Sequence, residues 1–250
     1  MIQNRDVNSS INIQEVHPAL IEDLVAASRF LASEGVLDAF GHVSARHPGN
    51  ANRYLMSCNL APELVTASDI MEFEVETSNA VDTSGRPVFL ERFIHGAIYR
   101  ARPDVHAVVH SHSPSVIPFG IVSSVPMRPV YHMSGFLHAG VPVYEIRNDA
   151  GLSDMLIRNV ELGNALARVL GDKAVALLRG HGNVVVGSTI PLAVYRAMYT
   201  DTNARLQIQA LSLGGPVTYL DPEEGRKIDS VVPTQVRRPW ELWKKKVIGK

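Results

Sequence analysis

The stretch VHAVVHSHSPS, residues 105–115, joins a short apolar run to two histidines that are one residue apart. The run is rich in β-branched residues and is followed by a proline, which indicates a buried β-strand. Because successive side chains of a strand point to opposite faces, His110 and His112 point to the same face, about 6 to 7 Å apart. Two imidazoles at this spacing can bind one metal ion, but a buried histidine in a strand can also be a hydrogen-bonded core residue.

The segments on both sides of this strand alternate between helical and extended patterns. Apolar residues at helical spacing predict helices over 17–34, from 87 to about 103, over 152–171, and from 191 toward 214. Extended segments between turn residues predict strands over 39–47, 53–59, 70–76, 141–146 and on both sides of the turn 180–183. Residues 113–129, rich in serine and proline, predict a loop or a broken helix. Helices and strands therefore mix in one α/β chain without a strict βαβ rhythm.

The composition is that of an ordinary globular protein whose partners are small molecules. Hydrophobic residues make up 46% of the 250 residues, charged residues make up 20%, and the formal net charge is -1. Such a balance gives no electrostatic signature of nucleic acid or membrane binding. The only cysteine, Cys58, excludes an intrachain disulfide and is typical of a reducing compartment. Since we find neither an export signal nor an apolar run of about 18 residues, we expect a cytoplasmic protein.

The pattern predicts one domain over residues 17–236, between a polar leader at 1–16 and a C-terminal tail at 237–250. The tail ends in KKKVIGK, which is typical of a solvated segment. Its two tryptophans, Trp240 and Trp243, are expected to pack on a subunit.

A metal site needs more than two ligands, and two residues outside the strand are candidates. His181 lies in the turn RGHGN, where glycines allow close backbone approach and the imidazole can reach a neighbouring site. Three neutral imidazoles leave open positions on a divalent cation, as in catalytic sites. Glu91 and His95 are four residues apart in the predicted helix before the strand, so they share a helix face. Glu91 could be a proton-transfer group or an extra ligand.

Four segments, in this order, resemble the class II aldolase/adducin family: GHVSAR at 41–46, LERFIHGAIYRARPDVHAVVHSHS at 90–113, RPVYHM at 128–133 and LLRGHG at 177–182. The resemblance implies a three-layer αβα sandwich around a central, mainly antiparallel β-sheet. It also implies that His110, His112 and His181 bind a divalent metal, with Glu91 as the acid/base or a fourth metal-facing group. A homotetramer with active sites at the subunit interfaces is a further implication.

The departures from the sugar-phosphate aldolases of this family concern the residues that hold phosphate. Those enzymes carry GN[IV]S, a Ser- or Thr-Gly turn, and a pair of serines before the acidic residue. At these places this chain has Gly41-His42-Val43-Ser44, Ser57-Cys58-Asn59 and Phe89-Leu90. Phenylalanine and leucine offer no hydrogen bond to a phosphate dianion, so a phosphorylated sugar is not the expected substrate. The family's catalytic tyrosine, which a neighbouring subunit lends, falls at His132 or, with a slip of one residue, at Tyr131.

These substitutions resemble the branch of the family that decarboxylates hydroxylated aromatic or pyridine dicarboxylates. Its substrates carry a carboxylate beside a hydroxyl, a pair that can chelate a metal ion while carbon dioxide leaves. The resemblance favours a metal-dependent lyase, with manganese preferred and zinc possible. Its catalytic residues would be Glu91 and His132, and its substrate-binding residues His42, Asn59, Arg92 and Tyr131. The alternative is an aldolase, epimerase or dehydratase acting on a non-standard sugar or hydroxy acid. A scaffold protein of the same fold would be free to lose the metal ligands, which are present here.

Overall fold

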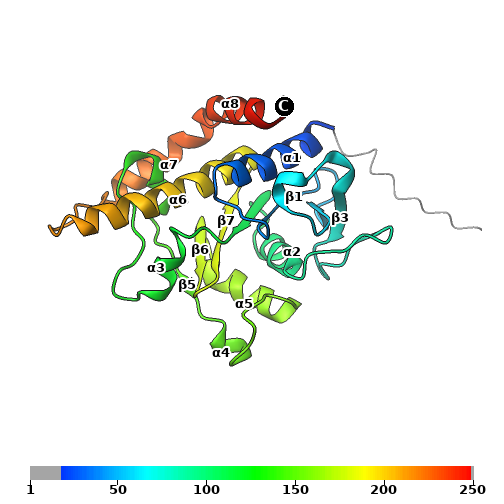
Figure 1. Cartoon of the computed structure of the whole chain (residues 1–250), viewed down its shortest axis with the longest axis horizontal. Helices are drawn as coiled ribbons and strands as arrows, with labels where there is room; N and C mark the ends of the chain where they lie inside the picture. Colours follow the sequence, from blue (N-terminus) through cyan, green and yellow to red (C-terminus); the bar gives the residue numbers. More distant parts are fainter. Residues whose placement is uncertain (1–17, 249–250) are drawn as a thin grey trace, which may run out of the picture.

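The chain is built around one seven-stranded β-sheet, in a computed structural model that describes residues 18–248 (Figure 1). The strand order is β3-β2-β1-β4-β7-β6-β5, and neighbouring strands are antiparallel except β5 and β6, which are parallel. The strands are β1 (His42–Arg46), β2 (Arg53–Ser57), β3 (Ile70–Glu74), β4 (Ala107–Ser111), β5 (Val143–Tyr144), β6 (Val175–Leu178) and β7 (Gly182–Gly187). The strand that carries His110 therefore lies at the centre of the sheet.

Helices cover both faces of the sheet (Figure 1). One face carries α1 (Pro18–Ser33), α6 (Ile190–Ser212) and α8 (Arg237–Ile248), and the other carries α2 (Arg92–Ala101) and α5 (Val160–Leu170). Alternate residues of β4 belong to the two cores: Ala107 and Val109 pack on the α1 side, and Val108 packs on the α2 side. The predicted three-layer αβα sandwich with a mainly antiparallel sheet is thus confirmed. Because His110 is two residues from Val108, it points to the α2 side.

Short helices and one long loop connect these elements. The short helices are η2 (Pro62–Leu64), η3 (Ala67–Asp69), α3 (Ile117–Ile121), η4 (His132–Leu137) and α4 (Arg147–Ala150). The isolated turn of α3 agrees with the broken helix expected at 113–129. α5 is shorter than the helix expected at 152–171, because Asn159 caps it by accepting a hydrogen bond from the Leu162 N–H. Residues 151–159 form a loop instead.

The two helices after α6 pack onto the same body. α7 (Pro222–Gln235), which the sequence patterns did not predict, begins at a capping box formed by Asp221 and Glu224.

The described helices include none with both the length and the apolar character needed to cross a bilayer.

The residues expected as a tail form α8, which packs on α1. Trp243 stacks on Phe30 of α1 with ring centroids 4.8 Å apart, and Trp240 is buried beside it. Lys244 pairs with Glu22 and Asp23 of α1. The tryptophans therefore pack within their own chain, and residues 237–248 form a helix that is anchored to the core by these two side chains rather than a solvated tail. The polar leader expected at 1–16 lies outside the described residues.

Candidate metal centre

Two histidines at the end of β4 point into one space. The Nε2 atoms of His110 and His112 are 3.1 Å apart. His110 lies opposite His42 of β1 and Val184 of β7 in the antiparallel ladder. Because β4 has a hydrogen-bonded strand on each side, the position of His110 is set by the sheet rather than by a loop.

His181 and Glu91 reach the same space from two other segments. His181 lies between Gly180, which has a φ of 65°, and Gly182, where a Cβ would overlap the carbonyl oxygen of Ser111. This close approach brings the His181 Nε2 within 3.2 Å of the His112 Nε2. Glu91 is the N-cap residue of α2, one residue before the helix rather than inside it. Its Oε2 lies 3.5 Å from the Nε2 atoms of both His110 and His181.

The four ligand atoms form a set that fits one divalent metal ion. They all lie within 4.8 Å of one another. Nitrogens bound at about 2.0 to 2.1 Å to one ion are about 2.8 to 3.0 Å apart when adjacent in octahedral geometry and about 3.3 to 3.4 Å apart in tetrahedral geometry. The Nε2–Nε2 distances of 3.1 and 3.2 Å lie between these two values. Glu91 and His110 are buried while His112 and His181 are partly exposed, so a ligand can approach from the side of the latter two.

The outer ring nitrogens indicate that a cation belongs between the rings. The His110 Nδ1 lies 3.1 Å from the backbone carbonyl oxygen of Asn183, which can only accept, so Nδ1 carries the proton. The His112 Nδ1 lies 3.3 Å from Oδ2 of Asp38, a carboxylate that also accepts. With an acceptor at each Nδ1, the Nε2 atoms of His110 and His112 face each other 3.1 Å apart, where both can bind one cation.

The Glu91 carboxylate is ionised and held from two sides. Burial alone would raise the pKa of Glu91, but the neighbouring His110 and His181 imidazoles outweigh burial and lower it. The backbone N–H of Ile157, in the loop before α5, donates to the other carboxylate oxygen, Oε1, over 3.0 Å. A negative charge next to three imidazoles favours a bound cation.

Asp38 adds a second carboxylate behind the histidines. Burial would raise the pKa of Asp38, but the backbone N–H groups of Phe40 and Gly41 and the contact with His112 lower it. Burial and the neighbouring histidines in turn lower the pKa of His112, which keeps this imidazole neutral and free to bind a metal.

The sequence as a whole matches a known family. Residues 22–208 match the Class II Aldolase and Adducin N-terminal domain. This chain belongs to the class II aldolase and adducin family. Among its relatives, decarboxylase tropJ of Talaromyces stipitatus is 36% identical over 249 residues, which cover 91% of this chain and 93% of the relative. The 3,4-dihydroxyphthalate decarboxylase of Arthrobacter keyseri is 32% identical over 217 residues, which cover 82% of this chain and 84% of the relative.

A solved structure supports the same fold. An aldolase II superfamily protein from Pseudomonas syringae superimposes with a TM-score of 0.77, covering 94% of this chain and 95% of that chain, at 24% identity. Glu91 and the three histidines of the candidate metal centre therefore lie on the fold that this family shares.

The remaining residues expected in the site occupy different environments. His42 is 3% exposed and lies beside the centre, with its ring 5.1 Å from the His110 ring and 4.6 Å from the Phe89 ring. The Arg92 guanidinium donates to the backbone carbonyls of Ser78 and Phe89, so in this structure it holds the segment before α2 instead of facing a ligand. Asn59 is exposed just after β2, and its backbone N–H donates to the Pro87 carbonyl.

His132 and Tyr131, the two candidates for the family's tyrosine position, have no contact with the four ligand residues in the described part of the chain. His132 is exposed at the start of η4 and lines a cavity of about 350 Å³ with residues of α7 and α8. The Tyr131 ring lies near Tyr199 of α6, and burial raises the pKa of the Tyr131 phenol. Either residue would need a neighbouring subunit to reach a metal centre.

The sequence patterns missed the residues that orient the ligands. Asp38 lies three residues before Gly41, a turn signal, but nothing in the sequence links it to His112. Asn183 and Ile157 act through backbone atoms, which no pattern of side chains reports.

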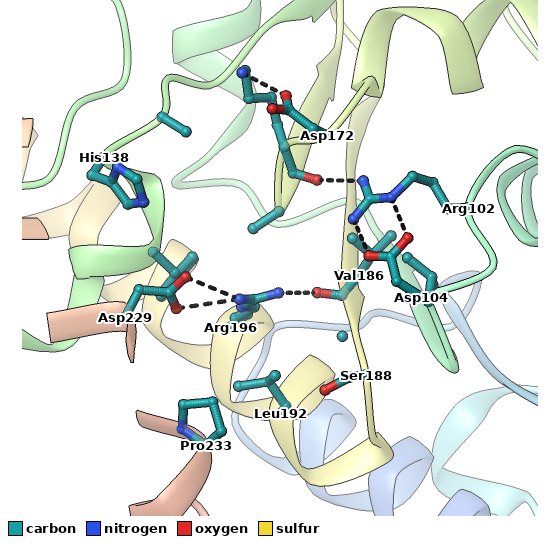
Figure 2. Close-up of a pocket in the computed structure, with 16 residues that line it drawn as sticks. Arg102, Asp104, His138, Asp172, Val186, Ser188, Leu192, Arg196, Asp229 and Pro233 are labelled. Carbon is teal, nitrogen blue, oxygen red and sulfur yellow. Dashed lines mark hydrogen bonds and ion pairs between the residues drawn. The ribbon is translucent and has the colours of Figure 1, made fainter. Parts of the chain in front are cut away.

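A second polar cavity, of about 300 Å³, lies at the opposite end of β4 and β7 (Figure 2). Its charged side chains are already paired with one another: Arg102 with Asp104, Arg196 with Asp229, and Lys173 with Asp172. Because these charges cancel in pairs, the cavity offers a ligand little uncompensated charge.

Proposed function

We propose that this chain is a metal-dependent decarboxylase, a lyase that removes a carboxylate ortho to the hydroxyl of a hydroxylated aromatic or pyridine dicarboxylate. The observation that carries the proposal is the set of three histidines and Glu91 around one space. The names of two relatives, decarboxylase tropJ and 3,4-dihydroxyphthalate decarboxylase, support the reaction and the substrate class.

The chain's own residues would hold the ion and keep it in place. A divalent cation, with Mn²⁺ favoured and Zn²⁺ possible, would supply a Lewis acid that binds the substrate's hydroxyl and carboxylate oxygens and withdraws electrons during decarboxylation. His110, His112 and His181 would be its nitrogen ligands. Asn183 and Asp38 keep the first two rings in the tautomer that exposes Nε2.

The side chains next to the ligands favour a flat ring over a sugar phosphate. Phe89, buried against His42, and Leu90, which is 57% exposed, directly precede Glu91. Phe40, which is 70% exposed, follows Asp38 by two residues. Such side chains cannot hydrogen-bond a phosphate dianion, whereas apolar residues around a few polar groups are usual in sites for aromatic ligands.

Glu91 is the group to which we assign proton transfer. Decarboxylation leaves an electron pair on the ring carbon, which must take up a proton. Glu91, ionised and held by the Ile157 N–H, accepts the proton of the substrate hydroxyl and delivers it to that carbon, either before or after carbon dioxide leaves.

We further propose a cytoplasmic homotetramer in which His132 or Tyr131 of one subunit completes the site of a neighbour. The exposed position of His132 supports this arrangement. His42 and Asn59 remain our candidates for the second carboxylate of the substrate. Arg92 is a weaker candidate, because its guanidinium is already bound to two backbone carbonyls.

The reaction is tested by offering two classes of substrate to the purified protein loaded with Mn²⁺ or Zn²⁺. Hydroxylated aromatic and pyridine dicarboxylates form one class, and fuculose and ribulose phosphates form the other. Release of carbon dioxide and formation of a carbonyl are followed separately. We expect metal-dependent release of carbon dioxide from the first class. Aldol cleavage without decarboxylation would rank the aldolase alternative above the decarboxylase.

The site is tested by variants of three residues. His110→Ala should lose bound metal, while His106→Ala, an exposed histidine near the start of the same strand, should keep it. Undiminished metal content in His110→Ala would refute the site. Glu91→Gln should keep most of the metal and lose about 10²- to 10⁴-fold in kcat, the range for removal of a general acid or base. Loss of metal in Glu91→Gln would instead make Glu91 a ligand.

A further inference from the structure

A chain of four polar side chains runs from the metal centre through the core. His42 and Ser44 are two residues apart in β1, and His95 and Tyr99 are four residues apart in α2, so each pair lies on one face of its element. The two faces meet between the sheet and the helix. The exposed fractions of His42, Ser44, His95 and Tyr99 are 3%, 0%, 0% and 1%.

Short hydrogen bonds join these four side chains in a single line. The His42 Nδ1 is 2.7 Å from the His95 Nε2, and the His95 Nδ1 is 2.6 Å from the Ser44 Oγ. The Ser44 Oγ is 2.7 Å from the Tyr99 hydroxyl. Tyr54 stacks on His95, with an interplanar angle of 16°, and fixes the plane of its ring. Burial of four polar groups costs free energy unless each is paired, and here each has a partner in the line.

The line has one favoured direction of donation. Each neutral imidazole carries one N–H, so a donor at one end orders every hydrogen bond that follows. The Tyr99 hydroxyl has Ser44 as its side-chain acceptor among residues 18–248. If Tyr99 donates to Ser44, Ser44 donates to the His95 Nδ1 and the His95 Nε2–H donates to the His42 Nδ1. In the opposite direction, the Tyr99 proton would be left without a side-chain acceptor.

The end of the line faces the metal centre. His42 is paired with His110 across the β1–β4 ladder, so both rings project from the same face of the sheet. With Nδ1 accepting from His95, the proton of His42 lies on Nε2, and the hydrogen bond of the His42 side chain within residues 18–248 is the one through Nδ1. A neutral donor suits this place, because a protonated imidazole would be repelled by a divalent cation held by His110.

We propose that Tyr99, Ser44 and His95 are positioning residues that fix His42 as the Nε2–H tautomer, so that His42 donates a hydrogen bond to an anionic oxygen of the substrate. The inference rests on the proposed function only for the identity of that substrate, a carboxylate. It assigns substrate specificity beside His110 to a neutral donor, His42, whose tautomer is set by Tyr99, three hydrogen bonds away in the core.

The tautomer is tested by long-range ¹H–¹⁵N NMR of the Zn²⁺-loaded protein, which reports the ring nitrogen that carries the proton. We expect His42 to be protonated at Nε2 and not at Nδ1. Tyr99→Phe removes one oxygen three hydrogen bonds away, which leaves Ser44 free to donate or accept, so both tautomers of His42 should appear. Tyr54→Phe is the matched control: its hydroxyl donates to the Arg92 carbonyl and is outside the line, so its spectrum should equal that of the unchanged protein.

Ser44→Ala and Ser44→Thr separate positioning from folding. The alanine variant should show mixed tautomers, and the threonine variant, which keeps a hydroxyl, should restore the single one. A proton on Nδ1 of His42 in the unchanged protein, or a single unchanged tautomer in both Tyr99→Phe and Ser44→Ala, would overturn the proposal.

Substrate recognition is tested with phthalate, a dicarboxylate without the reactive hydroxyl. Phthalate should shift the His42 Nε2–H signal, and the absence of a shift at saturation would refute donation to a carboxylate. With a dicarboxylate that the protein decarboxylates, Ser44→Ala should raise KM about twofold, because about half of the molecules would carry the other His42 tautomer. The value of kcat should stay nearly unchanged. A protein without decarboxylase activity would overturn the proposed function, while the NMR measurements would still decide the role of the line.

Discussion

Replacing Asp38 with asparagine should weaken metal binding about 10- to 100-fold, although Asp38 is not among the ligands. Its Oδ1 accepts hydrogen bonds from the N–H groups of Phe40 and Gly41, over 2.8 and 3.2 Å. Its Oδ2 lies 3.3 Å from the His112 Nδ1. An ionised carboxylate serves both sides because both of its oxygens accept.

Asparagine has only one oxygen for these two tasks. If the oxygen stays with the two backbone N–H groups, the amide NH₂ faces the His112 Nδ1, which must then accept. The His112 proton moves to Nε2, and this nitrogen can no longer bind a metal ion. If the amide turns over, the backbone N–H groups of Phe40 and Gly41 lose their acceptor in the turn. A 10- to 100-fold loss of affinity corresponds to about 1.4 to 2.7 kcal/mol.

The assay is a competition for Zn²⁺ between the metal-free protein and a chelating indicator. Asp82→Asn is the matched control, because the Asp82 Oδ1 also accepts from the N–H two residues later, Ser84, in an exposed turn that is not part of the site. We expect normal affinity in Asp82→Asn and reduced affinity in Asp38→Asn. Equal affinity in Asp38→Asn and the unchanged protein would show that the tautomer of His112 does not depend on Asp38.

Three further predictions concern stability. Gly163→Ala places a Cβ 2.6 Å from the Phe93 carbonyl oxygen, where α5 packs on α2. We expect the free energy of unfolding in urea to fall by about 1 to 3 kcal/mol, because the overlap outweighs the helix-propensity gain of about 1 kcal/mol. A stabilised variant would contradict this packing. Trp243→Ala removes the ring stacked on Phe30 and should cost about 3 to 5 kcal/mol; a loss below about 1 kcal/mol would mean that α8 contributes little to the core. Burial lowers the pKa of His95 to about 3 in the folded protein, whereas in the unfolded chain this pKa is about 6.5. Between these two pH values His95 is protonated in the unfolded chain and neutral in the folded protein. As the pH falls, His95 should therefore lower the free energy of unfolding of the metal-free protein by up to about 1.4 kcal/mol per pH unit. The slope of this free energy against pH should be shallower in His95→Gln. Identical slopes in the two proteins would show that His95 does not contribute.

The part of the site that follows from strand periodicity could be predicted from the sequence. The period of two places His110 and His112 on one face, and the glycines around His181 indicate a turn that allows close approach. Glu91 was found through its spacing to His95 and through the family resemblance. Its position differs, because the helix begins one residue later and the Ile157 N–H, not the helix, orients the carboxylate.

The rest could not be predicted because it depends on contacts between distant segments. His112 meets Asp38, which is 74 residues away in the sequence, and Glu91 meets Ile157 at a distance of 66 residues. The same reason applies to residues 237–248, whose lysines suggested a solvated tail. Lys244 instead has acidic partners on α1, and such pairing is not visible in a local window.

The packing of α8 on α1 has a consequence for the synthesis of the chain. Phe30 of α1 is fully buried in the finished protein, and one of the rings that covers it belongs to Trp243. The ribosome adds residues at about 5 to 20 per second, so α1 emerges roughly 10 to 40 s before the helix that stacks on it. During this interval part of the apolar face of α1 is exposed to solvent, and a chaperone that binds exposed apolar helices is expected to bind it.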